Sequence, residues 1–150
     1  MFAPPPATTA EVFARLPDHL RLVGRESEFI SIHPGHIPVH SLLEGPAFDR
    51  DGNFYCVDVP FGRVFRVDPQ GQFEVFAEYD GWPTGLKPHR DGRIFIADHL
   101  KGILVLDPQT KKIEPVLGRV RREGLKGVND LVFASNGDLY FTDQGQTGQH

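Results

Sequence analysis

Glu44, Thr84 and Asn129 head three similar segments of the sequence, and their side chains are of the kinds that bind a hard cation. The segments are EGPAFDRDGNFYCVD (44–58), TGLKPHRDGRIFIAD (84–98) and NDLVFASNGDLYFTD (129–143). A carboxylate, a hydroxyl and an amide oxygen around one axis form an all-oxygen environment that suits Ca²⁺ best, with Mg²⁺ or Mn²⁺ next. The same residue types also cap strand ends by bonding to the backbone. Spacing alone leaves both interpretations open.

The three segments repeat in a way that indicates a β-propeller. Each reads as a strand, an Asp-Gly or Asn-Gly turn, and a second strand that ends in Asp. The turn glycines at 52, 92 and 137 are 40 and then 45 residues apart, and such dipeptides favour type I′ turns with positive φ at both central residues. Two further strand-like stretches follow each of the first two hairpins. Four strands per 40 to 45 residues is typical of a propeller blade.

We therefore predict an all-β chain in which residues 42–150 form part of a propeller. The complete blades are expected at about 42–80 and 81–120, and an incomplete one at 127–150. About two and a half blades are too few for a ring, because propellers have four to eight. The chain is thus expected to be the N-terminal half of a longer protein, or to complete a ring by self-association.

Residues 1–41 lie outside the repeat and form an N-terminal extension. Thr8 and Glu11 predict a capping box for a short helix that runs through Leu16 and ends at Pro17. The proline-broken stretch 28–41 could supply a strand that closes the ring.

The predicted topology brings the three polar residues together. The first two strands of a blade are antiparallel, so the start of the first and the end of the second lie on one face. Because the first strand is the innermost, Glu44, Thr84 and Asn129 should converge at the mouth of the central channel. Neighbouring strand residues point opposite ways, so Asp130 should face the blade interior or a turn in a structural role.

Five other side chains are expected on the same face. Asp58, Asp98 and Asp143 recur at the ends of the second strands, which favours turn capping over chemistry. Trp82 could form the wall of a substrate pocket or plug the gap between two blades. His99 could reach a substrate, although a single histidine at the rim is more often solvated.

The composition places the chain among ordinary globular proteins. It has 150 residues, 39% of them apolar, and a net charge of -4, which favours neither disorder nor nucleic-acid binding. Cys56, the only cysteine, lies in the apolar run FYCV and is expected to fill the core. The start lacks the pattern of a signal peptide, and no stretch approaches 18 apolar residues. We expect a cytoplasmic protein without membrane contact.

Two clusters of side chains suggest sites that the sequence does not support. His33, His36 and His40 fit no helix face, and Pro34 and Pro38 break their segment, so zinc is not expected there. The basic stretch GRVRREGLKG (118–127) reads as a solvated connection between blades, although it could attract anionic substrates or products.

Three stretches together resemble the senescence marker protein/gluconolactonase/luciferin-regenerating enzyme (regucalcin-like) family. They are EGPAFDRDGNFYCVD, HRDGRIFIADHLKGILVLDP and GVNDLVFASNGDLYFTDQGQTG. The resemblance implies a six-bladed propeller that hydrolyses small-molecule lactones with one divalent cation. The oxygen donors make calcium the cation that we expect, with Mg, Mn or Zn as alternatives. The resemblance also implies that Glu44 is a metal ligand and that Asn129 contacts the metal or the substrate. The catalytic Asp of the family and its remaining Asn ligand would lie beyond residue 150.

The resemblance is incomplete, and two other functions stay open. Gly127 stands where the regucalcin-like branch has an arginine that grips a sugar, so a sugar lactone is less expected than lactone hydrolysis itself. A non-catalytic binding propeller of the NHL kind would share the Asp-Gly hairpins but not Glu44 and Asn129 at the strand heads. A truncated product without activity would expose apolar faces of the last hairpin and aggregate.

Overall fold

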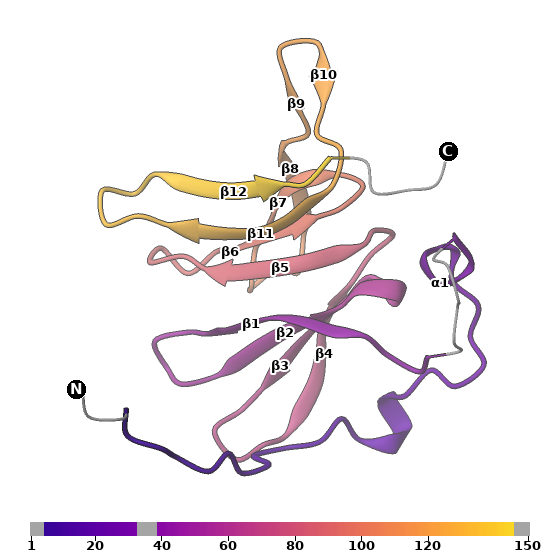
Figure 1. Cartoon of the computed structure of the whole chain (residues 1–150), viewed down its shortest axis with the longest axis vertical. Helices are drawn as coiled ribbons and strands as arrows, with labels where there is room; N and C mark the ends of the chain where they lie inside the picture. Colours follow the sequence, from indigo (N-terminus) through magenta and orange to yellow (C-terminus); the bar gives the residue numbers. More distant parts are fainter. Residues whose placement is uncertain (1–4, 33–38, 146–150) are drawn as a thin grey trace.

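Blade 1 of the computed structural model, which describes residues 5–32 and 39–145, is one four-stranded antiparallel sheet (Figure 1). Its strands lie side by side in chain order, so β1 is at one edge and β4 at the other. They are β1 (Leu43–Phe48), β2 (Phe54–Asp58), β3 (Arg63–Val67) and β4 (Phe73–Glu78), with a 3-10 turn, η2 (Val59–Phe61), between β2 and β3. The predicted four-strand unit is present.

Blade 2 repeats this arrangement, and a hairpin follows it. Its strands are β5 (Pro83–Pro88), β6 (Ile94–Asp98), β7 (Gly102–Leu106) and β8 (Ile113–Leu117). The predicted third unit has two strands, β11 (Val128–Phe133) and β12 (Leu139–Asp143). The basic connection forms a small protruding hairpin of β9 (Arg119–Val120) and β10 (Glu123–Gly124) (Figure 1). The fold is therefore a partial β-propeller, as predicted.

The core lies between successive sheets, because the middle strands are apolar on both faces. One buried cluster joins blades 1 and 2 and includes Val57, Val64, Leu86 and Ile96. A second cluster joins blade 2 to the last hairpin. Its fully buried members are Ala97, Ile103 and Val128, with Phe95 and Leu131 nearly so. The face of the hairpin that no blade covers leaves Val132 and Tyr140 more than half exposed.

The hairpin loops differ from the predicted type I′ turns. Gly52, Gly92 and Gly137 have φ of 83°, 94° and 95°, but the Asp or Asn before each has negative φ. The loops are longer than two residues, because Phe48 pairs with Phe54 across the first one. Each glycine N–H instead donates to a carbonyl three residues earlier. A turn of that kind needs only one left-handed residue, and glycine supplies it.

The N-terminal extension departs from prediction in two places. Residues 5–17 form no helix, so the proposed capping box of Thr8 and Glu11 is wrong; the short helix of the extension is α1 (Glu28–Ile32). The ring-closing strand expected from residue 28 is therefore wrong for 28–32, while 33–38 lie outside the described residues. Leu16 explains why no helix forms at residues 5–17. Its side chain is buried against Cys56 and Phe65 of blade 1, and the chain makes this contact in an extended conformation.

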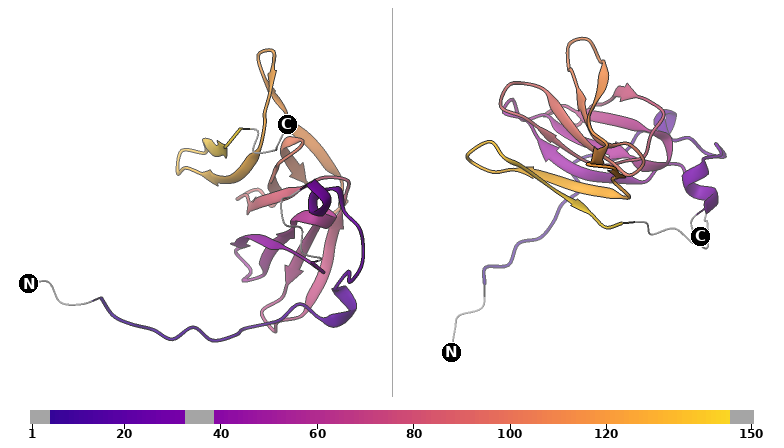
Figure 2. Two further views of the ribbon diagram at one scale, coloured as in Figure 1. Left: turned by 45° about the vertical axis from the view of Figure 1, so that its right-hand side comes forward. Right: turned by 90° about the horizontal axis from the view of Figure 1, so that it is seen from above.

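The rest of the extension runs past blade 1 toward α1 (Figure 2). A 3-10 turn, η1 (Asp18–Leu20), follows Pro17.

Cys56 is buried as predicted, and burial raises the pKa of its thiol to about 12. Within the described residues, no helix has the length and apolar character needed to cross a membrane.

Candidate functional site

The inner strands of successive blades approach each other closely at two places next to the predicted site residues. β1 packs on β5, and β5 packs on β11 (Figure 1). A Cβ on Gly45 would lie 2.7 Å from the Cα of Gly85, and a Cβ on Gly85 would lie 2.9 Å from the carbonyl oxygen of Asn129. Only glycine allows the backbones to approach this closely. The heads of the three inner strands therefore sit side by side, as predicted.

The pairing register makes Glu44, Thr84 and Asn129 equivalent. Leu43, Pro83 and Val128 pair with Asp58, Asp98 and Asp143 in their own blades. Each of the three polar residues follows directly after the first paired residue of its strand. In each hairpin the pairing register then shifts by one residue: between Glu44 and Ala47, between Pro83 and Gly85, and between Val128 and Leu131. Such β-bulges bend a strand and re-aim its side chains, and they are common next to active sites.

Glu44 and Asn129 are half-buried, and their side chains have no hydrogen-bond or ion-pair partner among the described residues. Burial raises the pKa of the Glu44 carboxyl above its ordinary value. The polar atoms of Glu44 and Asn129 stay open to solvent, because no side-chain nitrogen or oxygen among the described residues is both buried and without a partner. The oxygens of both side chains are therefore available to a cation.

Thr84 is used differently from the other two. Its hydroxyl lies 2.9 Å from the carbonyl oxygen of Val128 and 3.2 Å from that of Ala97, and the residue is only 9% exposed. It therefore ties blade 2 to the last hairpin. Among the three equivalent residues, only Glu44 and Asn129 offer uncommitted oxygens.

Asp130 faces β5 of blade 2 rather than a turn or the interior of its own blade, so the expected orientation is wrong. Its side chain is 56% exposed, and its carboxylate lies against Gly85 and 3.6 Å from the Nζ of Lys87, both on β5. The register shift after Val128 breaks the strict alternation on which the expectation depended. Asp130 still has a structural role, because its contact with Lys87 links β11 to β5.

Two of the three aspartates that end the second strands, Asp98 and Asp143, cap turns as predicted. Asp58 instead accepts a hydrogen bond from the backbone N–H of Leu42, sixteen residues earlier, and pairs with Arg63. Asp58 and Asp98 are fully buried. Asp98 accepts hydrogen bonds from the backbone N–H groups of Leu100 and Lys101, and Asp143 accepts one from that of Lys126. None of the three carboxylates is left without a partner.

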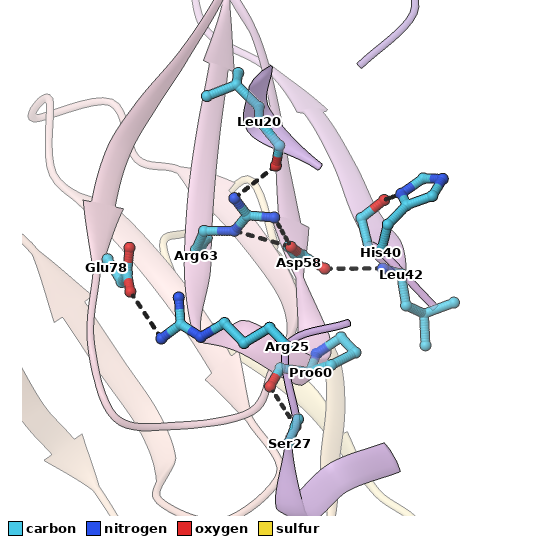
Figure 3. A network of polar contacts seen from close by, with 10 residues as sticks. Leu20, Arg25, Ser27, His40, Leu42, Asp58, Pro60, Arg63 and Glu78 are labelled. Atoms are coloured by element: carbon cyan, nitrogen blue, oxygen red, sulfur yellow. Dashed lines mark hydrogen bonds and ion pairs between the residues drawn. The ribbon is translucent and has the colours of Figure 1, made fainter. Parts of the chain in front are cut away.

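Each buried aspartate also has its own side-chain donor. Asp58 forms an ion pair with Arg63, which stands opposite it on β3 (Figure 3). In blade 2 the residue opposite Asp98 is Gly102, and the hydroxyl of Tyr79 donates to Asp98 at 2.7 Å. Burial, and the nearby carboxylate of Asp98, raise the pKa of Tyr79, so this hydroxyl stays a donor.

Trp82 and His99 form one aromatic stack on the same face. Their ring centroids are 5.9 Å apart with an interplanar angle of 29°. Phe29 of α1 packs edge-on against Trp82 at 5.3 Å and leaves the indole 8% exposed. The geometry favours the interpretation of Trp82 as a plug over that of a pocket wall, while His99 keeps a partly exposed edge. The sequence carries no signal for Phe29, because it precedes the repeats.

Gly85→Ala tests whether the close approach of the inner strands is required. We expect a loss of about 1–3 kcal/mol in the free energy of unfolding, because the added methyl would meet the backbone of Asn129 and Asp130. Urea unfolding measures it. Gly124→Ala is the matched control, since its methyl would meet nothing closer than 3.9 Å. Equal stability of the two variants would show that β5 and β11 do not touch there.

The donor set fits a hard cation in kind but not in number. Glu44 and Asn129 supply oxygen, which Ca²⁺ and Mg²⁺ prefer, but Ca²⁺ takes six to eight ligands. No cluster of three or more His, Cys, Asp or Glu side chains suited to a metal occurs in the described parts of the chain. His33 and His36 lie outside those parts, and His40 bonds through Nδ1 to the hydroxyl of Ser41 at 2.7 Å.

Taken together, the fold and the site define a partial β-propeller with two uncommitted oxygen donors at the heads of its inner strands. A family model described as SMP-30/Gluconolactonase/LRE-like region matches residues 42–150. The chain belongs to this family, as the sequence motifs indicated.

Its relatives include lactonases from staphylococci. Lactonase drp35 of Staphylococcus haemolyticus is 32% identical over 108 residues, and that of Staphylococcus epidermidis is 33% identical over 109. Each match covers 67% of this chain and 33% of the relative. The matched region thus spans about a third of the length of these proteins.

Solved structures show the same fold. A gluconolactonase from Xanthomonas campestris superimposes with a TM-score of 0.64 at 24% identity, over 69% of this chain and 35% of that one. Virginiamycin B lyase from Staphylococcus aureus gives 0.59 at 13% identity, over 75% and 40%. Since a gluconolactonase and a lyase share the architecture, the fold alone does not determine the chemistry.

Proposed function

We propose that this chain carries part of the active site of a cation-dependent lactone hydrolase. One observation carries the proposal: Glu44 and Asn129 stand at equivalent inner-strand heads with their side-chain oxygens uncommitted. Membership of a family that includes lactonases supports the reaction class. The substrate would be a small lactone, and calcium is the cation that the donor types favour, with Mg, Mn or Zn as alternatives.

Each of the two side chains would have its own task. Glu44 would provide the negative charge that holds the cation, and because burial raises its pKa, protons compete with the cation for this carboxylate as the pH falls. Asn129 would contribute its amide oxygen to the cation or its amide N–H to the lactone. A bound divalent cation polarises the carbonyl and stabilises the oxyanion that develops on attack.

The remaining ligands and the general base would come from outside the described residues of one chain. Asp130 pairs with Lys87 at 3.6 Å, and the aspartates that end the second strands already accept hydrogen bonds, so none of these four carboxylates is free to serve as a base. Either further blades of a longer protein or a second copy would complete the site. The intact mass of the protein from its source separates these two routes.

Chelation of the metal tests the proposal. The protein, purified from its source at the length at which it is made, should hydrolyse γ- or δ-lactones, lose that activity in EDTA and regain it with CaCl₂, MgCl₂, MnCl₂ or ZnCl₂. A pH-stat assay measures acid release. Hydrolysis that EDTA does not affect would contradict the metal. Absence of both lactone hydrolysis and cation binding by calorimetry would support a binding propeller instead.

A further inference from the structure

A cleft of about 580 Å³ lies at the opposite end of blades 1 and 2 from the candidate site. Its walls come from the loop between β1 and β2, the loop between β5 and β6, the turn between β7 and β8, and side chains of β3 and β4. Phe76 and Ile94 provide an apolar floor. Because both flanking blades are complete, the cleft needs nothing beyond the described residues.

The cleft is basic although the chain as a whole is acidic. The net charge of the protein is -4, yet four cationic side chains line the cleft against two carboxylates. The cations are Arg50, Arg66, Arg90 and Lys111, and the carboxylates are Asp49 and Asp51. Asp49 is already satisfied, because it accepts hydrogen bonds from the backbone N–H groups of Asp51 and Asn53 and from the Asn53 amide.

Lys111 occupies a backbone conformation that lysine rarely adopts. Its φ is 61°, in the left-handed region, which is costly for a residue with a Cβ. The corresponding turn of blade 1, between β3 and β4, has Gly71 in that conformation. Blade 2 therefore has a lysine at the left-handed position of the turn, where blade 1 has a glycine. The Lys111 side chain lines the cleft.

The ammonium group of Lys111 has no carboxylate partner among the described residues. Its Nζ lies 3.0 Å from the centre of the Phe76 ring, and desolvation lowers its pKa. Arg66 stacks near the same ring at 5.2 Å and pairs with Glu74 at 2.6 Å. The nearby carboxylate of Glu74 raises the Lys111 pKa, and the positive charge of Arg66 lowers it. Two cations at one aromatic ring, against the single carboxylate of Glu74, leave a positive charge that can attract an anion.

We propose that this cleft is a second binding site, distinct from the candidate metal site, for a small organic anion. The carboxylate or phosphate of the ligand would lie between Lys111 and Arg66, and its carbon skeleton would rest on Phe76 and Ile94. The hydroxyl of Tyr55 also lines the cleft and interacts with the carboxylate of Asp49, so it would exchange that partner in order to donate to the ligand. Burial and the charge of Asp49 raise the pKa of Tyr55 to about 12, so it remains a donor at physiological pH.

Lys111→Gly separates binding from folding. The substitution removes the ammonium group and its contact with Phe76 but relieves the left-handed backbone strain, so the chain should stay folded with a stability close to that of the wild type. Isothermal titration with citrate and with inorganic phosphate should show one saturable site in the wild type, weakened about tenfold in the variant. Lys112→Gln is the matched control, since Lys112 is its neighbour but pairs with Glu114 at 2.7 Å.

The outcomes are distinct. Weaker binding in Lys111→Gly with binding retained in Lys112→Gln supports the site. Preference for citrate over phosphate would identify a carboxylate ligand, and the reverse a phosphate ester. Equal affinity in the wild type and Lys111→Gly, or no saturable heat with either probe, would overturn the proposal. Because no step involves Glu44 or a metal, its failure would leave the lactonase proposal untouched.

Discussion

Glu44→Gln is expected to lower kcat/KM for lactone hydrolysis about 10²–10³-fold in the protein as it is made by its source. Glutamine keeps the shape and one oxygen but removes the charge that would hold the cation. The same substitution should weaken cation binding, measured by calorimetry with CaCl₂. Asn129→Ala should depress kcat and cation affinity in the same direction, because it removes the other uncommitted oxygen.

Glu44→Gln should lower activity but slightly raise the free energy of unfolding when no cation is present. Burial raises the pKa of Glu44 in the folded chain, so the carboxyl binds its proton more tightly when folded than when unfolded. Stability is therefore lost as pH rises from the unfolded pKa through the folded pKa. Glu44→Gln does not titrate and escapes this loss. We expect the variant to match the wild type in acid and to exceed it slightly at pH 7.

A cation should reverse that order, and this reversal distinguishes a metal ligand from a residue that only packs. Adding CaCl₂ should raise the Tm of the wild type, more at pH 7 than at pH 5, because binding requires the deprotonated carboxylate. The Tm of Glu44→Gln should not move. Glu114→Gln, on the exposed edge strand β8, is the control and should behave as the wild type. Unchanged kcat/KM and unchanged cation affinity in Glu44→Gln would remove Glu44 from the site.

The parts of the fold that could be predicted are those that the repeats specify locally. Glycine after Asp or Asn marked each hairpin, and the apolar middle strands indicated sheets covered on both faces. Equivalence by repeat was enough to place Glu44, Thr84 and Asn129 side by side, because propeller blades differ mainly by rotation about one axis. The family followed from the same segments.

The parts that could not be predicted depend on contacts between distant segments. The β-bulges turn Asp130 toward Lys87, and strand alternation alone cannot show them. Leu16 gains more from burial on blade 1 than Thr8 and Glu11 would gain from a helix cap. The repeat predicts the Thr84 hydroxyl as a third cation ligand, but in the structure this hydroxyl donates to the Val128 carbonyl. In each case tertiary packing overrode a sound local preference.

Arg63→Met is expected to cost about 3–5 kcal/mol in the free energy of unfolding, because it leaves a fully buried carboxylate without its countercharge. Asp58 is 0% exposed and Arg63 is 3% exposed. The guanidinium Nε lies 2.9 Å from Asp58, and Nη1 donates to the carbonyl of Leu20 at 2.8 Å (Figure 3). Asp58 also accepts from the backbone N–H of Leu42 at 2.8 Å. One ion pair thus fastens two parts of the chain before β1, at Leu20 and at Leu42, to blade 1.

The double variant Asp58→Asn with Arg63→Met isolates the charge from the packing. It should recover most of the loss measured by urea unfolding, since no unpaired charge remains and asparagine can still accept from Leu42. The deficit of the single variant should shrink as pH falls, because protonation of Asp58 removes the uncompensated charge. Lys112→Met, which breaks an exposed pair with Glu114, should change stability little. Equal losses in the single and double variants at every pH would show that Arg63 acts only through its packing on Phe61 and Phe65.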